Sequence, residues 1–424
     1  MNSSILEARE TRIHLIHQII SKNDRNVISI KANTPGKNKN TKESYLLVKL
    51  FKNIIHPMVT IRSIQLIEGF DGPSFLIEVN EKDTILLKNI LVEIEESHEL
   101  GRFIDLDLYK DTNKSISRFD LNIAPRKCFL CETDAVICSR TQSHLVDEIS
   151  QYIEISIRKY LLKQIEKFLD EAMTKELELE YKFGLVTKTS QGSHPDMDYS
   201  RMVKGKNAII PYLVQMFELG FYCESLTEIH NKGRIVGIKA EESMNDATNG
   251  INCYKGLIFL SGLALLSLGY TMQTHNDFDD LFSFVQKMTK DLLKEFNQEP
   301  LTSGMRVYRQ YHITGVRGEA HQGLSSIRHG LSIIENLDTV SDQDLRGLLI
   351  QLILKSEDTV FLKRAGSMEK YNLVKEMLSK IDVTNFEQIV HFNNYAIKEN
   401  LSFGGAADLL VTTLLLHKVK KDFF

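Results

Sequence analysis

The stretch ISQYIEISIRKYLLKQIEKFL, residues 149–169, divides the chain into two parts of different character. Its aliphatic residues recur at every fourth position from Ile149 to Leu169, which is the spacing of one helix face. Before this helix, strand-like and helical patterns alternate, and after it nearly every pattern is helical. We therefore predict a multidomain protein, with an N-terminal α+β domain over residues 1–151 and a mainly α-helical domain over residues 152–424.

Local patterns predict individual elements mainly in the N-terminal part. The turn Asp71-Gly72-Pro73 separates two strand patterns, which predicts a hairpin or a broken pair of strands. In the C-terminal part, the best strand candidate is residues 233–238. The predicted strands of the N-terminal part are residues 27–32, 61–68, 75–79 and 103–109, and its predicted helices are residues 7–20 and 83–96.

Composition and charge restrict the class of protein. A length of 424 residues suits two domains, and a formal net charge of -4 gives no sign of bulk nucleic-acid binding. The longest apolar run, residues 256–268, is too short and too rich in Gly and Ser to span a membrane, so we predict a buried helix. The N-terminus lacks a secretory pattern and the number of cysteines is odd, which predicts reduced thiols in a cytoplasmic protein.

An aspartate pair lies in the segment GRFIDLDLY, residues 101–109. On a strand, Asp105 and Asp107 point to the same face, while the apolar residues beside them point to the core. Two carboxylates this close repel each other unless a cation lies between them, and hard oxygen ligands favour Mg²⁺. Such a pair could hold the metal of a nucleotidyl-transfer site. The alternative is the solvent-exposed face of an amphipathic strand.

Cysteines and basic residues are concentrated after this strand. A C-x-x-C sequence with a third cysteine and a histidine can bind Zn²⁺ tetrahedrally, and the residues are Cys128, Cys131, Cys138 and His144. The alternative is a set of small, partly buried thiols beside a phosphate pocket. The basic residues that could receive phosphates, or could equally be surface charges, are Arg118, Arg126, Lys127 and Arg140.

Five short segments of the N-terminal part occur in the order typical of one enzyme family. They are TPG at 34–36, DGP at 71–73, GRFIDLD at 101–107, SR at 117–118, and RKCFLC at 126–131 with CSR at 138–140 and His144. Residues 1–150 therefore resemble the holo-acyl carrier protein synthase of citrate lyase. The resemblance implies transfer of a phosphoribosyl-dephospho-CoA group to a serine of the citrate lyase acyl carrier protein, with release of diphosphate. It also supports Mg²⁺ at the aspartate pair and leaves zinc open.

The C-terminal part contains a histidine and two aspartates in a loop that includes Gly and Pro. In an extended segment His194, Asp196 and Asp198 would converge, so they could bind Mg²⁺ or activate a hydroxyl group. The alternative is a helix-entry turn in which an aspartate serves as a cap. The segment before this loop begins with Lys182, a candidate for binding substrate phosphates.

Two further clusters combine basic residues with glycines. Lys255 begins the apolar segment, where a helix N-terminus could help it hold a phosphate. Residues 302–320 contain Arg306 and Arg317, whose planar guanidinium groups suit a polyphosphate, and Glu319 adds a carboxylate to the same region. The alternative for this second cluster is a structural Arg–Glu pair.

A Gly-Gly pair precedes the last helical pattern of the chain. We predict that Gly404, Gly405 and Asp408 contribute to substrate binding. The alternative is a turn that needs a positive φ angle, which glycine adopts without strain.

Taken in order, these segments resemble the triphosphoribosyl-dephospho-CoA synthase family over residues 152–424. The segments are GLV at 184–186, GSHPDMD at 192–198, NCYKG at 252–256, RVYRQY at 306–311, GVRGEA at 315–320, EDT at 357–359 and GGAADLL at 404–410. The resemblance implies that ATP and 3′-dephospho-CoA react with release of adenine. The family usually has Thr-His where this chain has Cys253-Tyr254, which puts a histidine base at that position in doubt.

The two resemblances together imply a bifunctional enzyme without a nucleic-acid or membrane partner. The residues expected to bind Mg²⁺, act as a base or stabilise charge in the helical part are Asp196, Asp198 and Glu319, and those expected to hold phosphates are Lys255, Arg306 and Arg317. Two alternatives stay open. One half could be a docking module for the carrier subunit without activity of its own, or the helical part could hydrolyse an N-glycosidic bond, with water in place of dephospho-CoA.

Overall fold

The computed structural model describes residues 4–23, 25–110, 114–297 and 303–424. It contains two compact units, of which unit 1 is Met1–Lys163 with Lys421–Phe424 and unit 2 is Gln164–Lys420. The boundary between the two units falls inside the long helix α5, Val146–Glu178. This helix confirms the one predicted from the four-residue spacing. A multidomain chain with an α+β part before a mainly helical part is likewise confirmed. The boundary between residues 151 and 152 stays a prediction.

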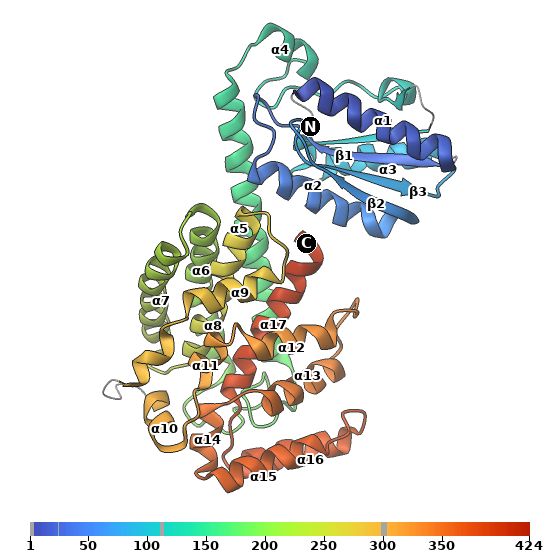
Figure 1. The fold of residues 1–424 in the computed structure, drawn as a ribbon. Coiled ribbons are helices and arrows are strands. Elements are labelled where there is room, and N and C mark those ends of the chain that lie inside the picture. The colour runs from blue at the N-terminus through green and yellow to red at the C-terminus, as the bar shows by residue number, and fades with distance from the viewer. Residues whose placement is uncertain (1–3, 24, 111–113, 298–302) are drawn as a thin grey trace. The chain divides into compact units, whose positions relative to one another are not determined.

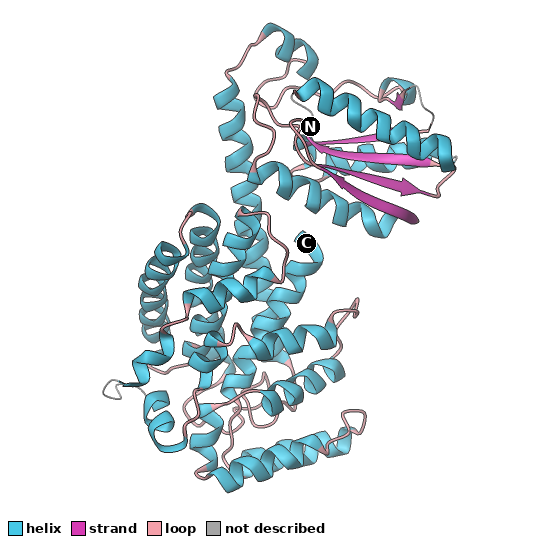
Figure 2. Ribbon diagram, in the orientation of Figure 1, coloured by secondary structure: helices cyan, strands magenta, loops and turns pink. Residues whose placement is uncertain are grey.

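Unit 1 contains the strands that the structure describes, and they form one antiparallel sheet with the strand order β2-β3-β1-β4-β5 (Figures 1 and 2). The strands are β1 Asn26–Ala32, β2 Ile61–Ile67, β3 Ser74–Val79, β4 Ile104–Tyr109 and β5 Ser115–Ile116. The helices before α5 are α1 Ile5–Asn23, α2 Lys42–Ile55, α3 Thr84–Ser97 and α4 Ala135–Thr141, with 3₁₀ turns at His56–Met58, Gly101–Phe103 and Phe119–Leu121. Strands β2 and β3 pair directly, so the predicted hairpin is confirmed.

The two faces of this sheet are covered by different helices. The contacts between α1 and its face of the sheet join Ile16 and Ile20 to Val27 and Leu76. On the other face, Lys52 of α2 lies over the ring of Phe75, whose cross-strand partner is Ile30. Side chains alternate between faces along a strand, so the face under α1 is also the face to which the odd-numbered residues of β1 point.

Unit 2 is built from helices throughout its described residues. After α5 they are α6 Tyr199–Tyr222, α7 Leu226–Thr248, α8 Lys255–Gln273, α9 Asp280–Met288, α10 Ser303–Tyr311, α11 Gly315–His321, α12 Ser325–Ile334, α13 Asp342–Lys355, α14 Thr359–Ala365, α15 Met368–Ser379, α16 Phe386–Lys398 and α17 Gly404–Phe423, with a 3₁₀ segment at Leu292–Asn297. Figure 1 shows α6, α7 and α8 as neighbouring helices of this unit.

Helix α8 is the buried centre of unit 2. Glycines let it approach α6 closely, because a Cβ atom on Gly220 would lie 2.1 Å from the carbonyl oxygen of Leu266, and one on Gly269 would lie 2.3 Å from that of Phe217. The helix is longer than the apolar run predicted, and by length and composition it could cross a membrane. However, 78% of its apolar window is buried inside the protein, which agrees with the predicted buried helix.

One strand prediction is wrong. Residues 233–238 lie inside helix α7. Their β-branched residues favour a strand locally. Gly233 is needed where α7 packs on α8, since a Cβ atom there would lie 2.4 Å from Leu266 Cδ1. Tertiary packing therefore overrides the local propensity.

Candidate functional sites

The aspartate pair of β4 lies on one face of the unit 1 sheet, as predicted from its spacing. Buried and half-exposed residues alternate along β4, and Asp105 and Asp107 are among the half-exposed ones. Asp105 keeps 41% of its side-chain exposure, so a ligand can reach its carboxylate. Burial by the surrounding protein nevertheless raises the pKa of both aspartates. Two adjacent carboxylates whose charged forms are disfavoured are the environment in which a bound cation is stabilising.

A network of cations around buried Asp71 lies beside this pair. In the register between β1 and β4, Lys31 is opposite Asp105, so both side chains share a face. The ammonium group of Lys31 lies 2.5 Å from Asp71 Oδ2, and the same carboxylate binds Arg12 at 2.6 Å and Arg9 at 3.0 Å. Burial lowers the pKa of Lys31 to about 8. Three cations around one carboxylate leave a surplus of positive charge next to the aspartate pair.

Two of the predicted phosphate-binding arginines contact carboxylates of unit 1. Arg126 donates to Asp105 Oδ1 at 2.8 Å and to the Ile104 carbonyl oxygen at 3.0 Å, and it also pairs with Glu95. Arg118 donates to the second oxygen of Glu95 at 2.8 Å. Buried Glu95 accepts a bond from the Leu106 backbone N–H at 2.9 Å. Arg126 and Arg118 are therefore fixed next to β4.

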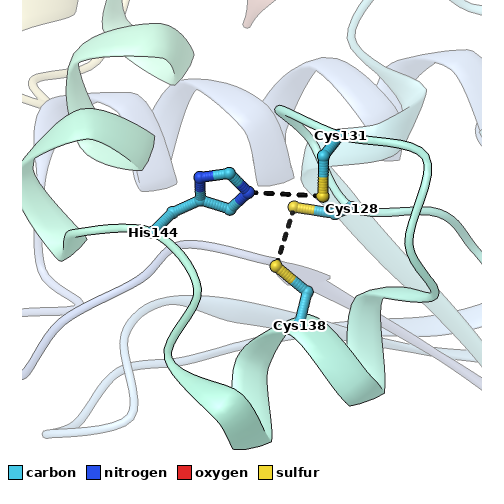
Figure 3. Close-up of side chains that lie close together, drawn as sticks. All are labelled: Cys128, Cys131, Cys138 and His144. Atoms are coloured by element: carbon cyan, nitrogen blue, oxygen red, sulfur yellow. Dashed lines mark hydrogen bonds between the residues drawn. The ribbon is translucent and has the colours of Figure 1, made fainter.

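The four predicted zinc ligands meet in space (Figure 3). We call them the cysteine cluster: Cys128, Cys131, Cys138 and His144. Their ligand atoms all lie within 4.8 Å of one another. The Cys138 and Cys128 sulfurs are 3.3 Å apart, and His144 Nε2 lies 3.3 Å from the Cys131 sulfur. All four residues belong to the segment between β5 and α5, and all five cysteines of the chain are free thiols.

The cluster has unequal thiols. The hydrogen bond with His144 lowers the pKa of Cys131 to about 6, while the neighbouring Cys128 sulfur raises the pKa of Cys138 to about 11. Arg140 is exposed on α4, and Lys127 forms an ion pair with Asp134 at 2.8 Å. Of the four basic residues predicted here, Arg126 is the one that the structure joins directly to the aspartate pair.

In unit 2, the first predicted loop is folded tightly by two glycines. A Cβ atom on Gly184 would lie 2.7 Å from Ser193 Oγ, and one on Gly192 would lie 2.2 Å from the Gly184 carbonyl oxygen. Lys182 at the start of this loop is fully buried, and its ammonium group donates to Glu176 Oε1 at 2.6 Å. Its amine is thus bonded inside the protein, and a phosphate-binding role for Lys182 stays a prediction.

The loop of His194, Asp196 and Asp198 is not in the extended conformation that the expected convergence assumed. Residues 194–197 form a turn, with the Met197 N–H bonded to the His194 carbonyl oxygen at 3.3 Å, so the argument from an extended chain does not apply. His194 is buried and Asp196 is exposed. Burial, with a contribution from Arg364, lowers the pKa of His194. Its ring contacts Ser402 Oγ at 2.9 Å through Nε2 and Arg364 at 3.5 Å through Nδ1.

Asp198 is a helix cap. It is the N-cap of α6, and its Oδ1 accepts from the Arg201 N–H at 2.7 Å. This is the alternative that the sequence left open. Burial raises the pKa of the Cys253 thiol to about 11. Arg201 opposes this shift, and the carboxylates of Asp196 and Asp198 add to it. The loop and the NCYKG segment are therefore close to each other.

Several motifs of unit 2 meet around Asp408 on α17. A Cβ atom on Gly256, at the start of α8, would lie 2.1 Å from Asp408 Oδ2. Burial, followed by the carboxylates of Asp358 and Glu176, raises the pKa of Asp408 well above its ordinary value. Tyr254 is buried in the same region, and its hydroxyl group has no hydrogen-bond partner among the residues that the structure describes.

The EDT segment joins two other motifs. Asp358 caps α14 by accepting from the Val360 and Phe361 N–H groups, and it also accepts from the Ala406 N–H at 3.3 Å. Glu357 accepts from the Thr314 N–H and hydroxyl groups, both at 2.8 Å. These bonds connect the starts of α11, α14 and α17, three segments far apart in the sequence.

Other predicted residues are placed elsewhere. Glu319 accepts from the Ser326 N–H at 2.7 Å and hydroxyl at 2.8 Å, and burial raises its pKa. Arg317 pairs with Glu295 at 3.2 Å. The structural ion pair between Arg317 and Glu319, the alternative left open by the sequence, is therefore not formed. Arg306 is exposed on α10, and Thr302 lies outside the described residues. Lys255 pairs with Glu241 at 2.5 Å.

Comparison with known families gives two matches, one for each part of the chain. Residues 2–160 match the family described as apo-citrate lyase phosphoribosyl-dephospho-CoA transferase, CitX. Residues 162–423 match the family described as ATP:dephospho-CoA triphosphoribosyl transferase, CitG. The chain belongs to the CitX–CitG fusion family.

Relatives of this fusion family have the same extent. A protein named CitXG from Leuconostoc mesenteroides subsp. cremoris is 30% identical over 98% of this chain and 96% of its own length. One of the same name from Haemophilus influenzae is 29% identical over 97% of this chain and 94% of its own length. A 2-(5''-triphosphoribosyl)-3'-dephosphocoenzyme-A synthase from Haemophilus ducreyi is 30% identical over 67% of this chain and 98% of its own length.

The chain is therefore a bifunctional enzyme. It combines triphosphoribosyl-dephospho-CoA synthase activity, the CitG function, with apo-citrate lyase phosphoribosyl-dephospho-CoA transferase activity, the CitX function. ATP, dephospho-CoA and citrate lyase are the substrates that these families imply.

Sequence reasoning missed four residues that lie beside the predicted site residues of this CitX–CitG fusion. Lys31 lies on a predicted strand, but its position opposite Asp105 depends on strand pairing. Asp71 was noticed only as part of a turn. Glu95 and Glu176 lie on helices and meet Arg126 and Lys182 through tertiary contacts. The local signal that could have identified Glu95 and Glu176 is the presence of a charged residue on a buried helix face.

Proposed function

We propose that each family domain performs its step at its own group of carboxylates. The transferase domain of residues 1–151 would use the aspartate pair, and the synthase domain of residues 152–424 would use Asp408 and Glu176. The observation that carries this proposal is geometric: Asp105 and Asp107 lie on one face of β4 with Lys31 opposite Asp105, and the Asp408 carboxylate lies against Gly256 of the NCYKG segment. Burial also raises the pKa of all three aspartates. Perturbed carboxylates of this kind are concentrated at active sites.

For the transferase step, Asp105 and Asp107 fit a Mg²⁺ ion, because two half-exposed carboxylates point to one face of the sheet and Lys31 lies opposite Asp105. When bound, Mg²⁺ supplies positive charge that neutralises the departing diphosphate. Lys31 and Arg12 would hold phosphate oxygens of the triphosphoribosyl-dephospho-CoA. A serine hydroxyl of the acyl carrier protein would attack the phosphate next to the ribose, and diphosphate would leave.

For the synthase step, the 2′-hydroxyl of 3′-dephospho-CoA would attack the anomeric carbon of the ATP ribose, and adenine would leave. The transition state has oxocarbenium character, which negative charge from Glu176 would stabilise. Asp408, whose raised pKa favours the protonated form, would donate a proton to the departing adenine, and the proton of the attacking 2′-hydroxyl would pass to solvent. Glycine at position 256 leaves room for that carboxyl group.

The remaining predicted residues are retained as proposals. Asp196 and Asp198 would bind Mg²⁺ attached to the ATP triphosphate, since both approach Cys253 of the NCYKG segment. Lys255, Arg306 and Arg317 would hold phosphates. Zinc would occupy the cysteine cluster. The free thiols agree with a reducing compartment, and we propose a cytoplasmic location.

Separate assays of the two steps test the proposal. Asp107→Asn should reduce diphosphate release by about 100-fold or more while adenine release persists, and Asp408→Asn should do the reverse when triphosphoribosyl-dephospho-CoA is supplied. Glu10→Gln on the exposed surface of α1 is the matched control. Loss of both activities in either variant would contradict one site per domain. If adenine release yields free phosphorylated ribose, the synthase part is a hydrolase instead.

A further inference from the structure

We propose that the cysteine cluster binds a structural Zn²⁺ ion that positions Arg126 against Asp105. The inference rests on the proposed function only in assigning Asp105 to the transferase site. Zinc binding itself is independent of that assignment.

The geometry of the cluster suits tetrahedral zinc. Zn–S bonds of about 2.3 Å and Zn–N bonds of about 2.0 Å separate the ligand atoms of a tetrahedral site by roughly 3.5–3.8 Å. The four ligand atoms here lie within 4.8 Å of one another, with two pairs at 3.3 Å (Figure 3). Three thiols and one imidazole form a complete Cys₃His set, and a closed set of four protein ligands is typical of structural sites.

The segment that carries the cluster is held to the rest of unit 1 mainly by polar bonds and by the contact of Phe129 with Phe103, and it has little regular structure of its own. Residues 126–144 contain one short helix, α4, and otherwise turns and an isolated bridge between Lys127 and Asp134. Val136 and Ile137 are 57% and 53% exposed, whereas Cys128 and Cys138 are buried. Two apolar side chains of α4 thus point outward, while two of the thiols point inward. A short segment without an apolar core usually depends on a metal or a disulfide.

The backbone of this segment connects the cluster to Arg126. Cys128 is two residues from Arg126, and the Ala135 N–H bonds to the Arg126 carbonyl oxygen at 2.8 Å. Arg102 donates to the Lys127 carbonyl oxygen at 2.7 Å and also to that of Cys128. The Arg126 side chain then reaches Asp105 Oδ1 at 2.8 Å. Fixing the cluster therefore fixes the arginine that contacts the aspartate pair.

Metal binding changes the protonation of the site in a defined way. Each coordinating cysteine gives up its thiol proton to solvent, and His144 binds through one neutral ring nitrogen. With a divalent ion and three thiolates the site has a net charge of about -1. No electron transfer is involved. Because the protein supplies all four ligands, the site is closed and has no open position for a substrate.

The first test measures metal content and metal chemistry in the full-length enzyme. We expect about one zinc ion per chain by elemental mass spectrometry, and a thiolate-to-cobalt absorption band after replacement with Co²⁺. Cys131→Ser and Cys138→Ser should lose most of the zinc and weaken that band. Cys223→Ser is the matched control, because Cys223 lies on the other unit at the end of α6 and should leave zinc unchanged.

The second test separates positioning from general folding. Diphosphate release from supplied triphosphoribosyl-dephospho-CoA should fall about 10- to 100-fold in Cys131→Ser, while adenine release by the same chain stays at the wild-type rate. Arg126→Ala should lose diphosphate release but keep its zinc. The inference is overturned if the wild-type enzyme is active without zinc or binds no Co²⁺. It is also overturned if the native mass shows a Cys128–Cys138 disulfide, or if Cys131→Ser keeps full transferase activity.

Discussion

The carboxylate of Asp408 lies against the backbone of Gly256, so closely that a Cβ atom on Gly256 would lie 2.1 Å from Asp408 Oδ2. The two residues belong to the NCYKG and GGAADLL segments, at the starts of α8 and α17. The backbone of Gly256 does not have a positive φ angle, so its conformation does not require glycine. Glycine is required because any side chain at position 256 would displace the Asp408 carboxylate.

Gly256→Ala should displace the Asp408 carboxylate and reduce adenine release by about 100-fold, because small displacements of reacting groups are costly. Diphosphate release from the supplied intermediate should not change. The matched control is Gly347→Ala, where the new Cβ atom would be 3.9 Å from the nearest side chain and the helix should gain about 0.5–1 kcal/mol of stability. Wild-type adenine release by Gly256→Ala would show that Asp408 has no part in the synthase step.

Tyr254 should separate stability from activity. Its buried hydroxyl has no partner among the described residues, so Tyr254→Phe should raise the free energy of unfolding by about 1 kcal/mol. If the hydroxyl binds a substrate, the same variant should raise KM in the adenine-release assay. Tyr254→His introduces the histidine of the Thr-His pattern typical of the synthase family that the sequence resembles, and we expect it to retain activity. A fall in the melting temperature of Tyr254→Phe would mean that the hydroxyl has a partner in the protein.

Lys31 should set an alkaline limit on the transferase step. Its pKa is lowered by burial to about 8, so the ammonium group is charged below that pH and neutral above it. Diphosphate release should therefore fall as the pH rises through the Lys31 pKa of about 8, because the neutral amine no longer attracts phosphate oxygens. Lys31→Arg should keep its rate to higher pH, because a guanidinium group stays protonated. An identical alkaline limb in both proteins would exclude Lys31 as its cause, with adenine release as the internal control.

His194 should make the protein sensitive to acid. Burial lowers the pKa of His194 below its ordinary value of 6.5, so the unfolded chain takes up the proton more readily than the folded one. Its contribution to stability is therefore complete above pH 6.5 and is lost as the pH falls further. In denaturant titrations between pH 7 and pH 5, His194→Gln should lose less stability than the wild type. An equal loss in both would place the acid sensitivity at other groups.

Regular elements were predictable where one face is buried and the other is polar. Strand β4 alternates strictly, so the common face of Asp105 and Asp107 followed from spacing alone. Helix α5 followed from its four-residue period. Residues 233–238 were assigned wrongly because the contact of Gly233 with Leu266 belongs to helix packing, which local patterns do not contain.

The sites were predictable only in part. The cysteine cluster came together as its spacing suggested. The alternation of His194, Asp196 and Asp198 predicted an extended segment. Alternation brings side chains to one side only in an extended chain, and these residues form a turn. The contact between Asp408 and Gly256 joins α17 to α8, two helices far apart in the sequence, so no spacing rule could have given it.

The most direct test of one active carboxylate group per domain is the intact mass of apo acyl carrier protein after incubation with ATP, dephospho-CoA and mixed variants. Asp107→Asn and Asp408→Asn should each leave the carrier unmodified when used alone. Mixed together, they should add the mass of one phosphoribosyl-dephospho-CoA group, since each variant supplies the step that the other lacks. An unmodified carrier in the mixture, under conditions where the wild-type enzyme modifies it fully, would contradict the account.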